Sequence, residues 1–376
     1  MVTRECNHQN TVKLIWGPPG TGKTKTVGVL LFSLLRMKCK TLTCAPTNTA
    51  VLEVTQRLLK NVIESLEYDT YGLGDVVLFG NGKRMKILDR HNLLDIFLDN
   101  RVSILHECLV SSSGWKGSLT SMICLLEDPR RQYNLYLNDR SMIDNEEEQI
   151  EDKKSKKNVR NVIVKASNEN KYKKNEGQVV DKCDSHLSFE EFVQRRFNCI
   201  LQRLKYCSVN LCTHLPTSFI SLEVVKKMKL ALDLLTSLEK LLSNVTVADK
   251  ELEQVSEEND QRFCHLMKYS FVRGDCLRIL RTIPKKFPVP DFRYEWEIKK
   301  FCLENSCLYF CTVSSFAKLH EVKTQWEVLV IDEAAQLKEC ESTIPLQLPG
   351  LRLAILIGDE RQLPAMVKSK VRVLLL

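Results

Sequence analysis

The segment that most constrains the fold is residues 17–24, which read Gly-Pro-Pro-Gly-Thr-Gly-Lys-Thr and fit the pattern G-x-x-x-x-G-K-[ST]. A short apolar run precedes this segment at residues 12–16, and a pattern typical of an amphipathic helix follows at 23–37. Glycines between a strand and a helix let backbone N–H groups point into a concavity that accepts phosphate oxygens, and the helix dipole adds positive charge there. The sequence therefore predicts a phosphate-binding loop.

Every residue of this loop is a candidate ligand of a nucleotide. The residues are Gly17, Pro18, Pro19, Gly20, Thr21, Gly22, Lys23 and Thr24. We expect the Lys23 ammonium to reach the β and γ phosphates and the Thr24 hydroxyl to ligate Mg²⁺. The alternative is an ordinary glycine turn followed by a surface lysine.

An acidic pair supplies the partner that a phosphate loop needs for Mg²⁺. Asp332 and Glu333 follow the apolar run at residues 328–331. We expect Asp332 to hold Mg²⁺ through water, and Glu333 to polarise the attacking water as a general base. Alone, such a pair at a strand end also suits the N-cap of a helix. Together with the loop, it indicates a catalytic nucleotide site.

Further apolar runs indicate strands at 41–45, 75–79, 307–311 and 353–357, and a helix at 48–59. Strands that alternate with helices imply parallel βαβ units with right-handed crossovers. We therefore expect an α/β fold, a parallel sheet flanked by helices and interrupted by a long, mostly helical insertion. The expected parts are 1–127 and 306–376 for the α/β domain, 128–186 for a charged insertion and 187–305 for a helical accessory insertion.

The charged insertion contains an acidic stretch at 144–152, followed by a lysine-rich stretch at 153–157. Aromatic residues are few here, and Asn and Ser are frequent, so we expect residues 128–186 to be disordered or weakly ordered. The lysines have two interpretations. They belong to a solvated linker, or they have a function, either as a nuclear import signal or as a phosphate-binding arm.

Composition narrows the function classes. Lys and Arg number 55 against 47 Asp and Glu, a net charge of +8 that favours polyanionic partners. The 15 cysteines include no C-x-x-C pair, which favours reduced thiols over a zinc site or a disulfide scaffold. The sequence contains no apolar run long enough for a transmembrane helix, so we expect no membrane partner.

Four further segments carry a family resemblance. Residues 332–336 read Asp-Glu-Ala-Ala-Gln, 358–364 read Gly-Asp-Glu-Arg-Gln-Leu-Pro, 45–51 read Ala-Pro-Thr-Asn-Thr-Ala-Val and 311–315 read Cys-Thr-Val-Ser-Ser. With the phosphate loop, and in this order, they resemble the motifs of superfamily 1 helicases, in the branch of senataxin and the nonsense-transcript regulator helicases. Plant senataxin-like helicases with a long charged insertion look most similar. The resemblance covers roughly residues 1–80 and 305–370.

The resemblance implies a RecA-like domain that uses ATP and Mg²⁺ to unwind RNA or DNA. In that family Gln362 would sense the γ-phosphate and act in catalysis beside Lys23 and Glu333. A single strand of RNA or DNA would run along five residues whose short polar side chains and backbone N–H groups suit phosphate contacts. These residues are Pro46, Thr47, Asn48, Thr312 and Ser314. Helix capping is the alternative role for each of them.

The resemblance further implies a monomer that is nuclear, with the cytoplasm as a second location, and protein partners that bind the helical insertion. The family's second RecA-like domain does not follow residues 358–364 before Leu376, and no adenine-recognition motif is evident in the sixteen residues before Gly17. That second domain supplies arginines worth roughly a thousandfold in rate. We therefore expect this chain alone to bind ATP weakly and to turn it over little.

Two alternatives to a helicase motor domain stay open. One is a truncated, non-catalytic remnant that binds nucleic acid or a protein partner. The other is a different P-loop ATPase, such as an oligomeric ring machine, which would need a polar sensor and a helical lid with an arginine. Residues 358–364 do not match that sensor, and no lid follows them.

Overall fold

A computed structural model describes residues 11–110, 112–141, 187–251, 258–290, 292–317, 324–359 and 361. For residues 243–251 and 258–266 it describes the backbone only. The chain divides into two compact units. The first comprises residues 1–118, 203–231 and 282–376, and the second comprises 119–202 and 232–281. Parts of the expected helical insertion therefore belong to the unit that holds the sheet, so the units do not follow the boundaries that the sequence suggested.

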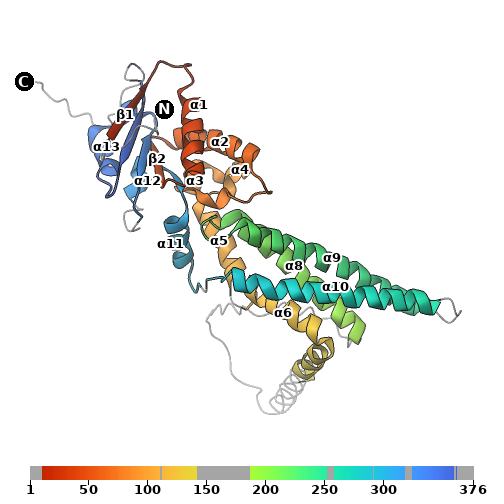
Figure 1. The fold of residues 1–376 in the computed structure, drawn as a ribbon. Coiled ribbons are helices and arrows are strands. Elements are labelled where there is room, and N and C mark those ends of the chain that lie inside the picture. The colour runs from red at the N-terminus through yellow and green to blue at the C-terminus, as the bar shows by residue number, and fades with distance from the viewer. Residues whose placement is uncertain are drawn as a thin grey trace, which may run out of the picture. The chain divides into compact units, whose positions relative to one another are not determined.

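The first unit is built on a six-stranded parallel sheet (Figure 1) in the order β1-β6-β5-β2-β4-β3. The strands are β1 Thr11–Trp16, β2 Thr41–Ala45, β3 Val76–Leu78, β4 Leu308–Thr312, β5 Val328–Ile331 and β6 Leu353–Gly358. The expected parallel α/β fold is confirmed, because each apolar run forms a strand within about a residue of its expected range. The long insertion separates β3 from β4, two strands that are neighbours in the sheet.

Helices flank the sheet and form most of the described part of the insertion. In the first unit α1 Lys23–Arg36, α2 Asn48–Ser65, α3 Gly82–Met85, α4 His91–Leu94, α5 Leu98–Leu109, α11 Glu295–Asn305, α12 Val313–Phe316 and α13 Glu339–Leu346 lie wholly within its residue ranges. The remaining named helices are α6 Trp115–Glu127, α8 Phe189–His214, α9 Leu222–Glu251 and α10 Glu258–Lys286. Residues 129–141 are also helical, within the range expected for the charged insertion, whereas 142–186 lie outside the described residues.

The main core lies between one face of the sheet and the helices α1 and α2 (Figure 1). Val27, Leu31 and Leu34 line the buried face of α1 and meet sheet residues such as Phe310 and Ile355. All residues of β2, β3, β4 and β5 are buried, as expected for strands covered on both faces.

The edge strand β1 has a different pattern, because buried and exposed positions alternate along it. Val12, Leu14 and Trp16 are 56%, 74% and 59% exposed. Trp16 pairs with Gly358 of β6, so the loop that follows β1 begins at the carboxyl edge of the sheet. No helix among the described residues is both long and apolar enough to cross a membrane.

A buried polar network fixes the start of β3. Asp75, which is 1% exposed, accepts hydrogen bonds from Lys38 Nζ at 2.6 Å and from the backbone N–H of Thr217 at 3.0 Å. Gly74 lies so close to residues 215 and 216 that an added Cβ would meet the carbonyl of Leu215 and, at 2.9 Å, the nitrogen of Pro216. These contacts attach residues 203–231 to the sheet.

Arg101 of α5 completes this network. Its side chain is fully buried and donates to the carbonyl oxygens of Leu73, Gly74 and Val76 at 2.7–3.0 Å, and to that of Asp95 at 3.2 Å. Burial lowers the pKa of this arginine from its usual value, whereas Asp75 and Asp95 oppose the shift. The guanidinium thereby links the backbone around the start of β3 to Asp95, before α5, through hydrogen bonds to carbonyl oxygens.

Candidate nucleotide and strand site

The phosphate loop joins the end of β1 to the start of α1. Gly20 and Gly22 have φ angles of +81° and +86°, a left-handed conformation that glycine adopts without steric cost. An added Cβ at either position would meet no atom within 4 Å, so the backbone conformation and not crowding requires glycine there. The loop therefore leaves open space beside the N-terminus of α1, the place where a phosphate group would bind.

Lys23 is held by the carbonyl oxygens of its own loop. Its Nζ donates to Gly17 O at 2.5 Å and to Pro18 O at 3.2 Å. Thr21 Oγ1 also donates to Pro18 O, at 2.8 Å. A phosphate that enters the loop would compete with these carbonyls for the ammonium, without a large movement of the lysine.

The acidic pair follows β5, at the same edge of the sheet. Asp332 is 5% exposed, and its backbone N–H donates to Cys44 O of β2 at 2.9 Å. Burial is the main cause that raises the pKa of Asp332 to about 6, with Glu333 adding to the shift and Lys23 opposing it. The structure thus brings the loop lysine and Asp332 into electrostatic range.

Glu333 occupies an unusual backbone conformation. Its φ and ψ are 52° and 41°, a left-handed geometry that costs energy for a residue other than glycine. Gln336 Nε2 donates to Glu333 Oε2 at 3.2 Å and restrains the carboxylate. Gln336 belongs to the motif at residues 332–336 but has no role predicted from it. Its spacing of three residues from Glu333 is the feature that could have indicated this contact.

A glycine at the end of β6 makes room for the turn that carries Glu333. A Cβ on Gly358 would lie 3.2 Å from Ala335 N and 3.3 Å from Ala334 N. Asp359 follows, 4% exposed, and its Oδ1 accepts from Arg361 N at 3.0 Å. Gln362 lies outside the described residues, so its expected role stays a prediction.

The donor set at this edge suits a nucleotide with Mg²⁺. Backbone N–H groups and the Lys23 ammonium match phosphate oxygens, and Thr24, half-buried at the start of α1, adds a hydroxyl. Asp332 adds a buried carboxylate with a raised pKa. A cation bound beside it would stabilise its ionised form. Hydroxyl and carboxylate oxygens are the ligands that Mg²⁺ prefers.

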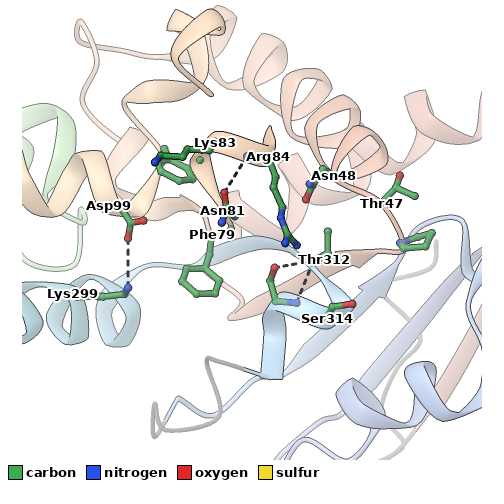
Figure 2. Close-up of a pocket in the computed structure, with 15 residues that line it drawn as sticks. Thr47, Asn48, Phe79, Asn81, Lys83, Arg84, Asp99, Lys299, Thr312 and Ser314 are labelled. Carbon is green, nitrogen blue, oxygen red and sulfur yellow. Dashed lines mark hydrogen bonds and ion pairs between the residues drawn. The ribbon is translucent and has the colours of Figure 1, made fainter. Parts of the chain in front are cut away.

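A second feature of this edge is a cavity of about 970 Å³ at the ends of β2, β3 and β4 (Figure 2). All five residues that the resemblance assigned to the strand track line it: Pro46, Thr47, Asn48, Thr312 and Ser314. Thr47 Oγ1 also accepts from Ala50 N at 3.2 Å, and Thr312 Oγ1 accepts from Ser315 N at 3.2 Å. These two threonines therefore cap helices and line the cavity at once.

The cavity also has lining residues that the sequence analysis missed, among them Phe79, Asn81, Lys83, Arg84 and Lys299. Lys299 Nζ lies 5.4 Å from the centroid of the Phe79 ring and 3.4 Å from Asp99 Oδ1. Figure 2 shows Lys83 and Arg84 on one side of the cavity and Ser314 on the other. The residues just after the expected strand at 75–79 are a usable signal, but nothing in the sequence points to Lys299.

Comparisons with known proteins agree with the motifs. A family model described as an AAA domain matches residues 2–370. The "Regulator of nonsense transcripts 1 homolog" of Drosophila melanogaster is 45% identical over 51 residues, which are 13% of this chain and 4% of that protein. The "DNA-binding protein SMUBP-2" of Rattus norvegicus is 46% identical over 50 residues, 13% of this chain and 5% of that protein.

The aligned segment is short in both cases, so these relatives match only a small part of this chain. The family model, in contrast, covers nearly the entire chain. The chain therefore belongs to the AAA-domain family that this model describes and, within it, to the superfamily 1 helicases of the senataxin and nonsense-transcript regulator branch.

Proposed function

We propose that this chain is the first motor domain of an ATP-dependent RNA or DNA helicase, which binds Mg-ATP at the phosphate loop and one nucleic-acid strand at the cavity. One observation carries the proposal. Both features lie at the carboxyl edge of the same parallel sheet, where such folds bind ligands. The hydrogen bond from Asp332 N to Cys44 O joins the strand that leads to the acidic pair and the strand that leads to Pro46.

The residues of the nucleotide site have separate roles in this proposal. Lys23 exchanges its loop carbonyls for phosphate oxygens and offsets their charge. Thr24 and Asp332 hold Mg²⁺, which when bound neutralises phosphate charge and polarises the phosphoryl group. Glu333, restrained by Gln336, accepts the proton of the attacking water. Gln362 remains our candidate for sensing the γ-phosphate.

The matched segments span 4–5% of the length of these curated relatives, so the activity of a whole helicase is a proposal for this chain. We propose that residues 1–376 by themselves bind ATP weakly and turn it over little. A monomer, a nuclear location with some cytoplasmic presence, and protein partners of the helical insertion complete the proposal.

Strand binding tests this function most simply. We would measure the fluorescence anisotropy of a labelled single-stranded oligonucleotide with the purified chain and with a double variant, Lys83→Ala and Arg84→Ala. Each lost phosphate contact lowers the slope of log affinity against log salt by about 0.7, so we expect weaker binding and a slope smaller by roughly 1.4. Arg278→Ala serves as the control, since Arg278 is exposed, pairs with Asp275 and is not among the residues that line the cavity.

Two results would contradict the proposal. One is that the wild-type chain does not bind a single strand at low salt. The other is that the double variant at the cavity and the Arg278→Ala control have the same affinity and the same salt slope. Hydrolysis of ATP measured alongside, with Glu333→Gln as background, shows whether residues 1–376 turn over ATP.

A further inference from the structure

A pair of aromatic residues is unusually exposed at the start of α11. Tyr294 is 58% exposed and Trp296 is 62% exposed. Their rings are nearly parallel, with an interplanar angle of 15° and centroids 6.5 Å apart. Large aromatic side chains are ordinarily buried, and two of them on one exposed surface favour a binding role over a packing role.

The backbone that carries this pair is fixed. Glu297 Oε2 accepts hydrogen bonds from the backbone N–H groups of Arg293 at 2.8 Å and Tyr294 at 3.1 Å. The opposite face of α11 is anchored in the protein, because Ile298 and Cys302 are fully buried. The aromatic pair is therefore presented on a rigid helix start and not on a loose loop.

This pair lies on the same helix as a residue that lines the cavity. Lys299 lines the cavity and lies three residues after Trp296, and Lys300 lies four residues after it, so all three side chains emerge on neighbouring parts of one helix face. Lys300 is 59% exposed and Lys299 is 41% exposed. Acidic residues are present here as well. Asp99 pairs with Lys299 at 3.4 Å and Glu304 pairs with Lys300 at 3.9 Å. Glu295 is exposed, whereas the carboxylate of Glu297 is engaged with the backbone.

Aromatic faces beside lysines are the combination with which proteins bind single strands without sequence preference, since bases stack on the rings and phosphates meet the cations. A strand that left the cavity past Lys299 would meet this pair next.

We propose that Tyr294 and Trp296 form a base-stacking platform that extends the path of a single nucleic-acid strand beyond the cavity. This inference rests on the proposed function. It adds that the ligand must carry unpaired bases at this point, because a duplex or a bare phosphate chain offers the rings nothing to stack. The phosphate contacts lie in the cavity, and the base contact lies on α11.

The test compares two ligands of equal length. Labelled single strands of roughly 16 nucleotides, with all bases present or with a run of abasic sites, are titrated by anisotropy into the full chain. The double variant Tyr294→Ala and Trp296→Ala should lose about 5- to 100-fold in affinity for the strand with bases. It should bind the abasic strand as the wild-type chain does.

Three controls make the result specific. Trp296→Phe keeps a stacking surface and should retain most of the affinity. Phe271→Ala removes another aromatic side chain, 72% exposed and in the other compact unit, and should have no effect. Thermal unfolding of each variant establishes that the fold is retained.

Failure of this inference differs from failure of the proposed function. If Lys83→Ala with Arg84→Ala weakens binding but the aromatic double variant binds both strands as the wild-type chain does, the cavity binds a strand and the platform does not; the pair then serves a protein partner or none. If the wild-type chain binds neither strand, both proposals are overturned. An equal loss on the strand with bases and the abasic strand would also contradict stacking.

Discussion

The backbone N–H of Asp332 donates a hydrogen bond to the carbonyl oxygen of Cys44, with 2.9 Å between nitrogen and oxygen. Asp332 is the first residue of the acidic pair after β5. Cys44 lies in β2, two residues before Pro46, which follows the strand and lines the cavity. Both residues are buried, Cys44 within β2 and Asp332 directly after β5. One backbone hydrogen bond therefore joins the residue that begins the acidic pair to the strand that leads to the cavity.

The pH dependence of stability should reveal the burial of Asp332. Its pKa is about 6 in the folded chain and near the model-compound value of 3.8 when unfolded, so the folded chain binds more protons between these values. Its contribution to the free energy of unfolding is thus fully present below about pH 4 and is lost as the pH rises through about 6. At neutral pH the ionised side chain costs about 3 kcal/mol.

Asp332→Asn removes this cost, so the variant should be the more stable protein at pH 7.5, and the advantage should vanish near pH 4. Denaturant unfolding of both proteins at each pH measures the difference. Comparison at equal pH also cancels the opposite effect of His214, whose pKa burial lowers to about 3 and whose stabilising contribution is lost as the pH falls below 6.5. A wild-type chain that is more stable than Asp332→Asn at pH 7.5 without ligand would contradict this account of the site.

Gly74→Ala should destabilise the first unit strongly. The added methyl group would press on the backbone at Leu215 and Pro216, and backbone atoms give way less easily than a side chain. Overpacking of this kind costs about 1–3 kcal/mol or more. Chemical denaturation gives the value, and Gly274→Ala is the matched control, because a Cβ there meets nothing within 4 Å in the helix α10 and should be neutral or stabilising.

Arg101→Lys should be far from conservative. A single ammonium cannot occupy the positions of the guanidinium nitrogens that meet four carbonyl oxygens, so some of these buried acceptors would lose their donor. Each buried polar group left unpaired costs about 1–3 kcal/mol. The midpoint of thermal unfolding should fall by several degrees, whereas Arg278→Lys, at an exposed ion pair, should leave it nearly unchanged. Equal midpoints for the two variants would show that the network around Arg101 is unimportant.

The sheet and its motif-bearing carboxyl edge could be predicted from the sequence because both depend on local signals. Apolar runs that stop at Gly17, Pro46 or Asp332 mark strands and their carboxyl ends, and parallel strands bring those ends to one edge. The phosphate loop is a contiguous pattern, and its conformation is set by the glycines themselves.

The parts that could not be predicted depend on contacts between distant residues. Lys299 lies 200 residues from its partner Asp99, and its place in the cavity follows from the packing of α11 against α5 within the first unit. Arg101 is charged and would be assigned to the surface, yet the carbonyls before β3 hold it in the core. Residues 203–231 look like part of a separate helical insertion, but Thr217 bonds Asp75 at the start of β3.

The most direct test of the central claim is calorimetric titration of ATP into the purified chain, with and without Mg²⁺. We predict weak binding that requires Mg²⁺, is abolished by Lys23→Ala and is retained by Glu333→Gln and by Lys25→Ala, a change at an exposed lysine just beyond the loop. Binding that Lys23→Ala leaves unchanged, or no heat of binding at millimolar ATP, would contradict the assignment of residues 17–24 as a working nucleotide site.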